Sequence, residues 1–452
     1  MTKLHLPTLF ALSLLGSCIH HEDGTSRSRS RRTDRATVDV ARDDHRRDRD
    51  DTDRDRDRDR DRDPDRDADR DDPVTRRTAS RSLTDAERTG IEWIVAHQLP
   101  SGGWGQGDEA PAMGSPGEMR DAANVADTCM ATLALIRSGN TPASGRHREV
   151  ARRGVEYVLA SVERSDDASL SVTDVQGTRV QAKIGTFVDT FASVLLMTEA
   201  KGLMASATEN RRLERALDRV VRKIERNQNP DGTWANQGWA PTLSQGMASL
   251  GLNRASQTGS EVPAELLARV EEQARGQFDA RTGNFAAGAG SAGVEIYAGA
   301  AASSGLRASA ETRRQNVRVL ERQARSDDSN VRARARRELD RGRRVAADAD
   351  EAEAGLVGRL SDQGFVSGFG SNGGEEFLSY MLISETLAAG RSERFDEWNG
   401  RMKTLLAGVQ NNDGSWAGHH CITGRTFCTS TALLVLLADQ GARTTSLREL
   451  RG

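Results

Sequence analysis

Two kinds of apolar segment alternate along the chain from residue 83 to residue 438. The first kind has apolar residues on one face and charged residues elsewhere, which is typical of a helix between a core and water. These segments fall near 83–97, 147–161, 210–227, 264–277, 331–347 and 395–410. The second kind is small and almost wholly apolar, near 124–137, 186–200, 243–255, 292–304, 376–389 and 426–438. Closing these six hairpins into a ring hides the second kind, so the pattern predicts an all-α, six-hairpin (α/α)6 toroid.

A glycine-bearing turn followed by a tryptophan ends three of the one-sided helices. We expect each glutamine to cap the helix of the next hairpin and each tryptophan to stack beside it, a structural role. The fourth turn is degraded, because Gln277 leads to Phe285, and the second hairpin lacks the motif. The intact turns run between Gln98 and Trp104, Gln228 and Trp234, and Gln410 and Trp416.

These turns and the alternating helices resemble the QW repeats of squalene and terpene cyclases and of protein prenyltransferase β subunits. The resemblance covers residues 83 to 447 and implies a central cavity that holds an apolar, isoprenoid or lipid, ligand. Aromatic residues on the buried segments are the candidate lining of this cavity: Phe187, Phe191, Tyr297, Phe377, Tyr380 and Phe427.

The first 82 residues have a different composition from the rest. Lys3, an apolar run from Leu9 to Leu15 and the small residues that follow have the layout of a secretory signal. The run from Leu15 to Cys18 resembles a bacterial lipobox, so residues 1–18 are a predicted lipoprotein signal with Cys18 as lipidation site; a plain cleaved signal is the alternative. The protein is therefore expected to be exported and to contact a membrane through a lipid anchor, at the outer membrane or on the periplasmic face of the envelope.

Charge is distributed unevenly along the chain. Residues 19–82 include an almost pure alternation of Arg and Asp, which cannot form a core and predicts a disordered linker before the toroid of residues 83–452. The formal net charge of -3 averages over these unlike parts, and no nucleic-acid partner is predicted. Residues 307–350 are rich in Arg and are expected to form a charged helical insertion that either meets anionic lipid head groups or is a solvated face.

Four of the buried segments carry a carboxylate at the same early position. Such a ring of acids could supply a general acid or hold a cation. Alternatively, acids in a first helical turn only offset the helix dipole. The four candidate catalytic residues are Asp127, Asp189, Glu295 and Glu376.

Sulfur and imidazole groups flank the two segments that meet where the ring closes. Asp, Cys and His are the ligand types of the catalytic zinc in prenyltransferase β subunits, although the later Asp-x-Cys pair and His of that family are missing. An exported domain favours a disulfide, of Cys428 with Cys421 or Cys129, and free buried thiols are the third alternative. No cofactor is predicted, and zinc is the alternative, with ligands from Asp127, Cys129, His419, His420 and Cys428.

The combined features predict an envelope-anchored binding protein for an apolar small molecule. Cyclase chemistry is disfavoured because it needs many aromatic faces around the cavity and only the six named aromatics lie on the buried segments, and because no DxDD motif occurs after residue 82. Two alternatives stay open: a divergent terpene cyclase or prenyltransferase-type enzyme, and a glycan-active lyase or hydrolase that uses paired carboxylates on an α/α toroid. The sequence leaves open whether the protein is an enzyme.

Overall fold

The computed structural model describes residues 81–110, 121–370 and 372–441. Every described residue belongs to one compact unit, which lies within Asp71–Gly452. The predicted signal with Cys18 and the predicted linker, apart from its last two residues, lie outside the described residues. Within the described ranges, no helix has both the length and the apolar character needed to span a membrane.

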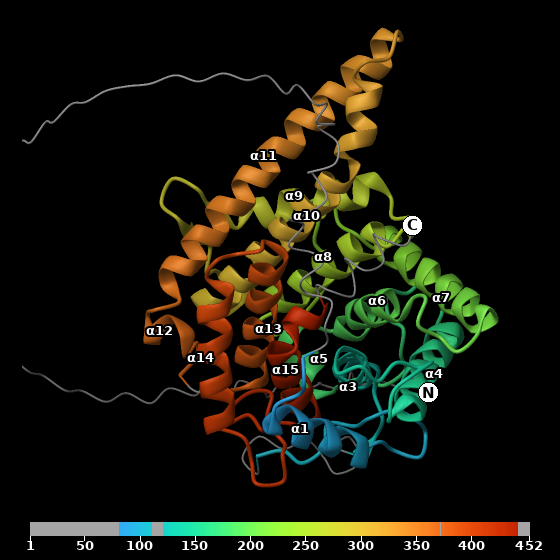
Figure 1. The fold of residues 1–452 in the computed structure, drawn as a ribbon, viewed down its shortest axis with the longest axis vertical. Coiled ribbons are helices and arrows are strands. Elements are labelled where there is room, and N and C mark those ends of the chain that lie inside the picture. The colour runs from blue at the N-terminus through green and yellow to red at the C-terminus, as the bar shows by residue number, and fades with distance from the viewer. Residues whose placement is uncertain (1–80, 111–120, 371, 442–452) are drawn as a thin grey trace, which may run out of the picture. The chain divides into compact units, whose positions relative to one another are not determined.

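Twelve helices of the described residues form six hairpins in a closed ring (Figure 1). The outer helices are α1 (Asp85–Ala96), α4 (Arg148–Arg164), α7 (Ala207–Arg226), α9 (Ala264–Gly276), α11 (Ser329–Arg359) and α14 (Phe395–Gly408). The inner helices contact one another in chain order, and the last returns to the first. They are α3 (Val125–Arg137), α6 (Val188–Ala200), α8 (Thr242–Gln257), α10 (Glu295–Gln323), α13 (Gly374–Ala389) and α15 (Arg425–Leu436). The predicted all-α, six-hairpin toroid is confirmed.

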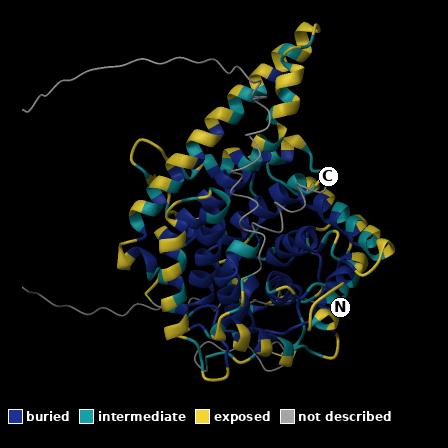
Figure 2. Ribbon diagram, viewed as in Figure 1, coloured by how far each residue is buried: buried dark blue, intermediate teal, exposed yellow. Residues whose placement is uncertain are grey.

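The inner and outer helices differ in burial as their sequences predict (Figure 2). Every residue of α3 and α6 is buried, whereas α7 buries a single stripe that includes Leu213, Leu217 and Ile224. Small residues let the inner helices approach closely: a Cβ added to Gly246 of α8 would lie 2.9 Å from the Ala301 Cα of α10. Each large apolar side chain buried here contributes roughly 1.5–3 kcal/mol to folding.

The last turn closes the ring against the first helix. The Gln410 Nε2 donates hydrogen bonds to the Ala86 carbonyl at 3.0 Å and to the Thr89 hydroxyl at 3.1 Å, both on α1. Gly414 has φ +88°, and a Cβ there would lie 2.7 Å from the Thr89 carbonyl oxygen, so only glycine fits. Trp416 lies beneath α1, where a Cβ added to Gly90 would approach its ring within 2.7 Å.

All three turn tryptophans are buried and make the same hydrogen bond. Each indole N–H donates to a carbonyl ten residues earlier, near the end of the preceding outer helix: Trp104 to Ile94 at 2.8 Å, Trp234 to Ile224 at 2.9 Å and Trp416 to Leu406 at 2.8 Å. The other two glutamines also reach the next outer helix. Gln98 donates to the Val150 carbonyl at 2.9 Å, and Gln228 accepts from Arg269 at 2.6 Å.

Smaller elements fill the connections between hairpins. The degraded turn after Gln277 forms a two-stranded antiparallel hairpin, β1 (Phe278–Asp279) and β2 (Asn284–Phe285), in which the two phenylalanine rings lie 5.2 Å apart. A 3-10 helix η3 (Ala289–Ser291) and the short helices α5 (Arg179–Ile184) and α12 (Gln363–Val366) complete the described elements. In this turn Phe285 therefore packs against Phe278, its partner across the strand pair.

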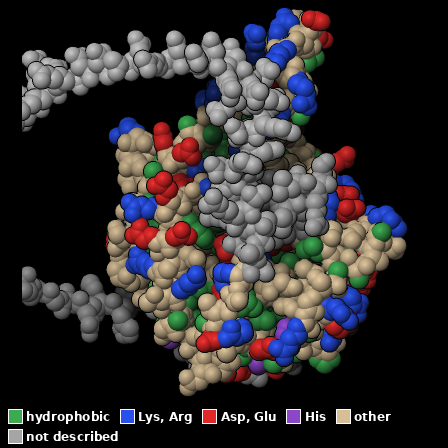
Figure 3. Space-filling view, viewed as in Figure 1, with side chains coloured by type: hydrophobic (Ala, Val, Ile, Leu, Met, Phe, Trp, Pro, Cys, Tyr) green, Lys and Arg blue, Asp and Glu red, His purple; other side chains and the backbone are tan. Residues whose placement is uncertain are grey.

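The charge-rich residues 307–350 belong to two long helices of the ring. They continue α10, which has 29 residues, and build most of α11, which has 31, so the extra length extends two ring helices and adds no separate pair. The C-terminal end of α10 and the N-terminal end of α11 project beyond the other hairpins and are largely exposed (Figures 1 and 2). Basic and acidic side chains lie side by side there (Figure 3).

The inside of the ring is charged near the carboxyl ends of the inner helices. Arg137 of α3 and Arg254 of α8 both form ion pairs with Glu199 of α6 and with Glu385 of α13. Their side chains are at most 9% exposed. These four residues, named here the charge quartet, join four of the six inner helices across the ring.

Candidate functional site

The amino ends of the inner helices meet at one mouth of the ring, because every hairpin returns in the same direction. Three of the four predicted carboxylates are buried there: Asp127, Asp189 and Glu376. Glu295 differs from them, since its side chain is 53% exposed and its Oε2 pairs with Arg359 at 2.5 Å. The structure therefore brings three predicted acids into a buried polar layer and leaves the fourth at the surface.

Asp127 and Asp189 form the first group of buried acids. Asp189 accepts two hydrogen bonds, from the Ala126 N–H at 2.9 Å and from the Gln181 amide at 2.7 Å. The Asp127 Oδ2 accepts from Asn124 at 2.7 Å, while its Oδ1 is buried without a hydrogen-bond partner. Burial raises the pKa of Asp127 to about 8 despite the Asn124 hydrogen bond, and the charge of Asp189 adds to the rise. Burial also raises the pKa of Asp189.

A loop segment, residues 105–110, lies at the mouth of the ring. The Gln106 side-chain oxygen accepts from the Arg179 N–H at 2.5 Å, and its carbonyl accepts from the Thr426 N–H at 3.2 Å. The Ala110 N–H donates to the Thr423 hydroxyl at 3.1 Å. The loop is thus hydrogen-bonded to the start of α5 and to the start of α15.

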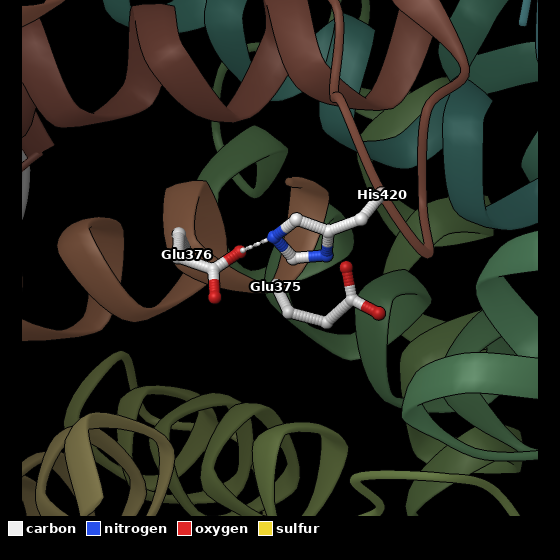
Figure 4. A group of neighbouring side chains, drawn as sticks. All are labelled: Glu375, Glu376 and His420. Atoms are coloured by element: carbon white, nitrogen blue, oxygen red, sulfur yellow. Dashed lines mark ion pairs between the residues drawn. The ribbon is translucent and has the colours of Figure 1, made fainter. Parts of the chain in front are cut away.

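Glu375, Glu376 and His420 form the second group, at the start of α13 (Figure 4). One ligand-type atom of each residue lies within 4.8 Å of the others. The His420 Nε2 is 3.4 Å from the Glu376 Oε2, and both carboxylates turn toward the imidazole. The two glutamates are fully buried, while the His420 side chain is 17% exposed. These are the described residues that could hold a metal ion.

The two glutamates have different partners. Glu376 accepts hydrogen bonds from the Tyr297 hydroxyl and from the Phe369 and Gly373 N–H groups, the last two at 3.0 Å. Glu375 accepts a hydrogen bond from the Ile422 N–H at 3.2 Å, and its Oε1 is buried without a hydrogen-bond partner among the described residues. Burial raises the pKa of Glu375 to about 8, and the neighbouring Glu376 contributes. Burial, followed by the Glu376 charge, also raises the pKa of Tyr297.

Aromatic side chains border this second group. The rings of Tyr297 and Phe369 meet Trp239 edge to face at 6.0 and 5.2 Å, and Phe369 is 51% exposed. Phe369 also lies 5.4 Å from the His420 ring. The Lys183 ammonium of α5 is 5.5 Å from the centre of the Trp239 ring. The mouth therefore offers an accessible aromatic surface beside buried carboxyl groups.

The three cysteines among the described residues are not joined to one another. Cys129, Cys421 and Cys428 are free buried thiols, so the disulfide expected for Cys428 does not form. Burial raises the pKa of Cys421 to about 12 and raises those of Cys129 and Cys428 well above the ordinary value. Of the predicted zinc ligands only His420 joins the cluster of three, and His419 is exposed.

Sequence reasoning missed several residues of the mouth. Glu375 had a signal, since it stands beside the candidate Glu376 at the start of the same helix. No sequence pattern marked Trp239, Phe369 or Lys183 as part of the mouth, because they lie in connections between hairpins, whose path depends on the closed ring.

Comparison with known proteins finds solved structures of similar fold but no similar sequence. No family model matches the sequence, and no curated protein matches it. An inactive variant of an alpha-1,6-mannanase of Salegentibacter sp. HEL1_6, solved with alpha-1,6-mannotriose, has 10% identity and a TM-score of 0.48, covering 78% of this chain and 98% of the mannanase. Two glycosidase variants, one of them in complex with glucose, have 14% identity and TM-scores of 0.43 and 0.44, covering 80% of this chain and all of theirs.

The expected kinship with squalene cyclases and protein prenyltransferases is wrong, since these structural neighbours are glycosidases. The predicted function, binding of an apolar ligand in a central cavity, is wrong as well. The charge quartet stands between four inner helices where an apolar cavity was predicted. Of the six aromatic residues predicted to line that cavity, five are at most 1% exposed and Phe187 is half-buried. They pack between hairpins: Phe191 lies 5.0 Å from Trp234, and Tyr380 lies 6.0 Å from Trp398 of α14.

Proposed function

We propose that the protein is a glycan-active hydrolase whose acid–base chemistry occurs at the mouth of the ring. One observation carries the proposal. Asp127 and Asp189 are neighbouring buried carboxyls on adjacent inner helices, and their surroundings differ in the way that acid–base pairs require. Asp127 has an unpartnered oxygen and a pKa raised to about 8, while both oxygens of Asp189 accept hydrogen bonds.

The two carboxyls have complementary roles in breaking a glycosidic bond. Asp127 stays protonated near neutral pH and donates its proton to the bridging oxygen as the bond from that oxygen to the anomeric carbon breaks. Asp189 supplies the carboxylate that either takes a proton from the attacking water or attacks the anomeric carbon itself. The anomer released first distinguishes these two routes. Because Asp127 and Asp189 are at most 1% exposed, the mouth must open when a substrate enters.

The aromatic surface at the mouth suits a sugar ring. Trp239 and the exposed Phe369 present flat apolar faces beside polar groups, the usual composition of a small-molecule site. Pyranose rings have apolar C–H faces and polar edges, so such a surface can hold them while the acids act.

Hydrolysis of a panel of neutral and acidic polysaccharides, followed by release of reducing ends, tests the proposal. The wild-type chain should cleave at least one class, and Asp127→Asn or Asp189→Asn should lower kcat by about 10²–10⁴-fold with the helical content kept. Glu295→Gln, an exposed acid at the same mouth, is the matched control and should keep full activity. Wild-type inertness toward every glycan, or full activity in both aspartate variants, would contradict the proposal.

A further inference from the structure

We propose that Glu375, Glu376 and His420 form a binding site for one divalent transition-metal cation, with Zn²⁺ as the representative ion. This inference goes beyond the proposed hydrolase and does not depend on it. It concerns the second group of side chains at the mouth, which the proposed acid–base pair does not use.

The spacing of the three groups fits one small cation. Two ligands about 2.1 Å from a tetrahedral zinc lie roughly 3.4 Å apart. The His420 Nε2 and the Glu376 Oε2 are separated by 3.4 Å. One potential ligand atom from each of the three side chains lies within 4.8 Å of the other two. Reducing a separation of 4.8 Å to this spacing takes a shift of about 1.4 Å in the Glu375 side chain, which completes a three-ligand site and leaves a fourth position for water or a substrate oxygen.

The Glu375 side chain provides an independent sign of a missing ligand. The whole residue is 0% exposed, and its Oε1 has no hydrogen-bond partner among the described residues. A buried carboxyl oxygen without a partner has lost its hydration and gained no hydrogen bond in exchange, which destabilises it. Figure 4 shows this carboxylate turned toward the His420 ring, so a cation between them would satisfy it.

The backbone leaves room around the cluster. A Cβ added to Gly373 would lie 2.8 Å from the His420 Cε1 and 3.0 Å from the Glu376 Oε2, and a Cβ at Gly368 would lie 2.5 Å from the Glu376 Oε1. Gly368 also has φ +62°, which favours glycine. Glycine at these two positions lets the loops of α12–α13 and α14–α15 approach Glu376 closely enough to share one ion.

The ligand types select the class of cation. Imidazole binds zinc and its transition-metal neighbours, whereas Mg²⁺ and Ca²⁺ prefer oxygen ligands and more of them. Cys421 lies next to His420 but outside the cluster of three, so the site is expected to hold the ion by nitrogen and oxygen alone. The positive charge of Lys183 interacts with the Glu375 carboxylate, so it also repels a divalent cation bound there.

Metal titration of the full-length protein tests the site directly. The chelator-stripped chain is titrated with ZnCl₂ by calorimetry, and bound zinc is counted after gel filtration. We expect one equivalent, with the Kd raised at least tenfold in Glu375→Gln and in His420→Gln. Mg²⁺ and Ca²⁺ should not compete at equal concentration. Absence of saturable binding, or unchanged binding in both variants, would overturn the site.

Three matched variants separate this site from its neighbours. His419→Gln removes an exposed imidazole one residue away, Glu295→Gln removes an exposed acid of the same mouth, and Cys421→Ser removes the nearest thiol. All three should bind zinc as the wild type does, and loss of binding in Cys421→Ser would assign the ion to a thiolate site and refute ours.

X-ray absorption of the wild-type zinc complex needs no variant to fold. It should show only nitrogen and oxygen near 2.0–2.2 Å, and a sulfur shell near 2.3 Å would refute the assignment. Since metal binding is read without a substrate, failure of the hydrolase proposal leaves this result unaffected.

Discussion

Removing one acid of the charge quartet should destabilise the fold strongly. In Glu385→Gln, Arg137 and Arg254 share a single carboxylate, so one buried positive charge is left uncompensated. The Arg137 and Glu385 side chains are 2% and 1% exposed, which leaves almost no water to solvate that charge. Breaking a buried pair in this way costs about 3–5 kcal/mol. This exceeds the roughly 1 kcal/mol of one surface ion pair several-fold.

A double-mutant cycle with urea unfolding, followed by circular dichroism, measures this cost. Arg254→Gln combined with Glu385→Gln leaves the neutral pair of Arg137 and Glu199, so the double variant should lose less than the sum of the two single losses. Glu272→Gln is the control: its side chain is 68% exposed and it pairs with Arg275 one helical turn away, so we expect a change within about 0.5 kcal/mol. A loss under about 1 kcal/mol in Glu385→Gln would show that water reaches the quartet.

Three further changes test other parts of the chain. Trp416→Ala removes a fully buried indole that packs under α1, so the free energy of unfolding should fall by roughly 3–5 kcal/mol; a fall under about 1 kcal/mol would refute the structural role of this tryptophan. Gly246→Ala places a methyl against the backbone of α10 and should cost about 1–3 kcal/mol in the same assay, and an unchanged stability would show that the helices can separate freely. Cys18→Ala tests the predicted lipid anchor, and it should move the protein from the membrane to the soluble fraction; unchanged fractionation would exclude that anchor.

The architecture was predictable because it depends on a repeated local pattern. Alternating one-sided and wholly apolar segments require two concentric layers of helices, and start signals such as the Thr84 cap, which forms a capping box with Glu87, fix where a helix begins. The lengths of α10 and α11 were not predictable in this way. Toward their projecting ends the two helices pack against each other and bury few apolar residues, Ala335 of α11 among them, so the apolar pattern fades before either helix ends.

The mouth was only partly predictable, because it combines local and long-range features. Asp127, Asp189 and Glu376 share an early position in their helices, which the sequence displays. The meeting of Glu375 with His420 depends on a loop 45 residues later in the chain, and periodicity does not describe the path of a loop. The charge quartet had a signal that the family resemblance obscured, since Arg and Glu within apolar helices imply partners inside the ring.

The pH dependence of stability tests the protonation state that the proposed hydrolase requires. The folded pKa of Asp127 is raised to about 8, while an unfolded aspartate titrates near 3.9. The folded protein therefore holds this proton more tightly than the unfolded chain does. Its contribution to stability is fully present below about pH 4 and is lost as pH rises through 8, with a slope that approaches about 1.4 kcal/mol per pH unit.

Asp127→Asn cannot ionise, so it should lack this slope. The unfolding free energy of the variant should rise relative to that of the wild type between pH 5 and pH 8, by about 1 kcal/mol or more per unit. Asp189 and Glu375 titrate in both proteins, and their contributions largely cancel in the difference. A difference that stays constant across this range would mean that Asp127 is already ionised at neutral pH. The carboxyl would then have no proton to donate, and the proposed general acid would be excluded without any knowledge of the substrate.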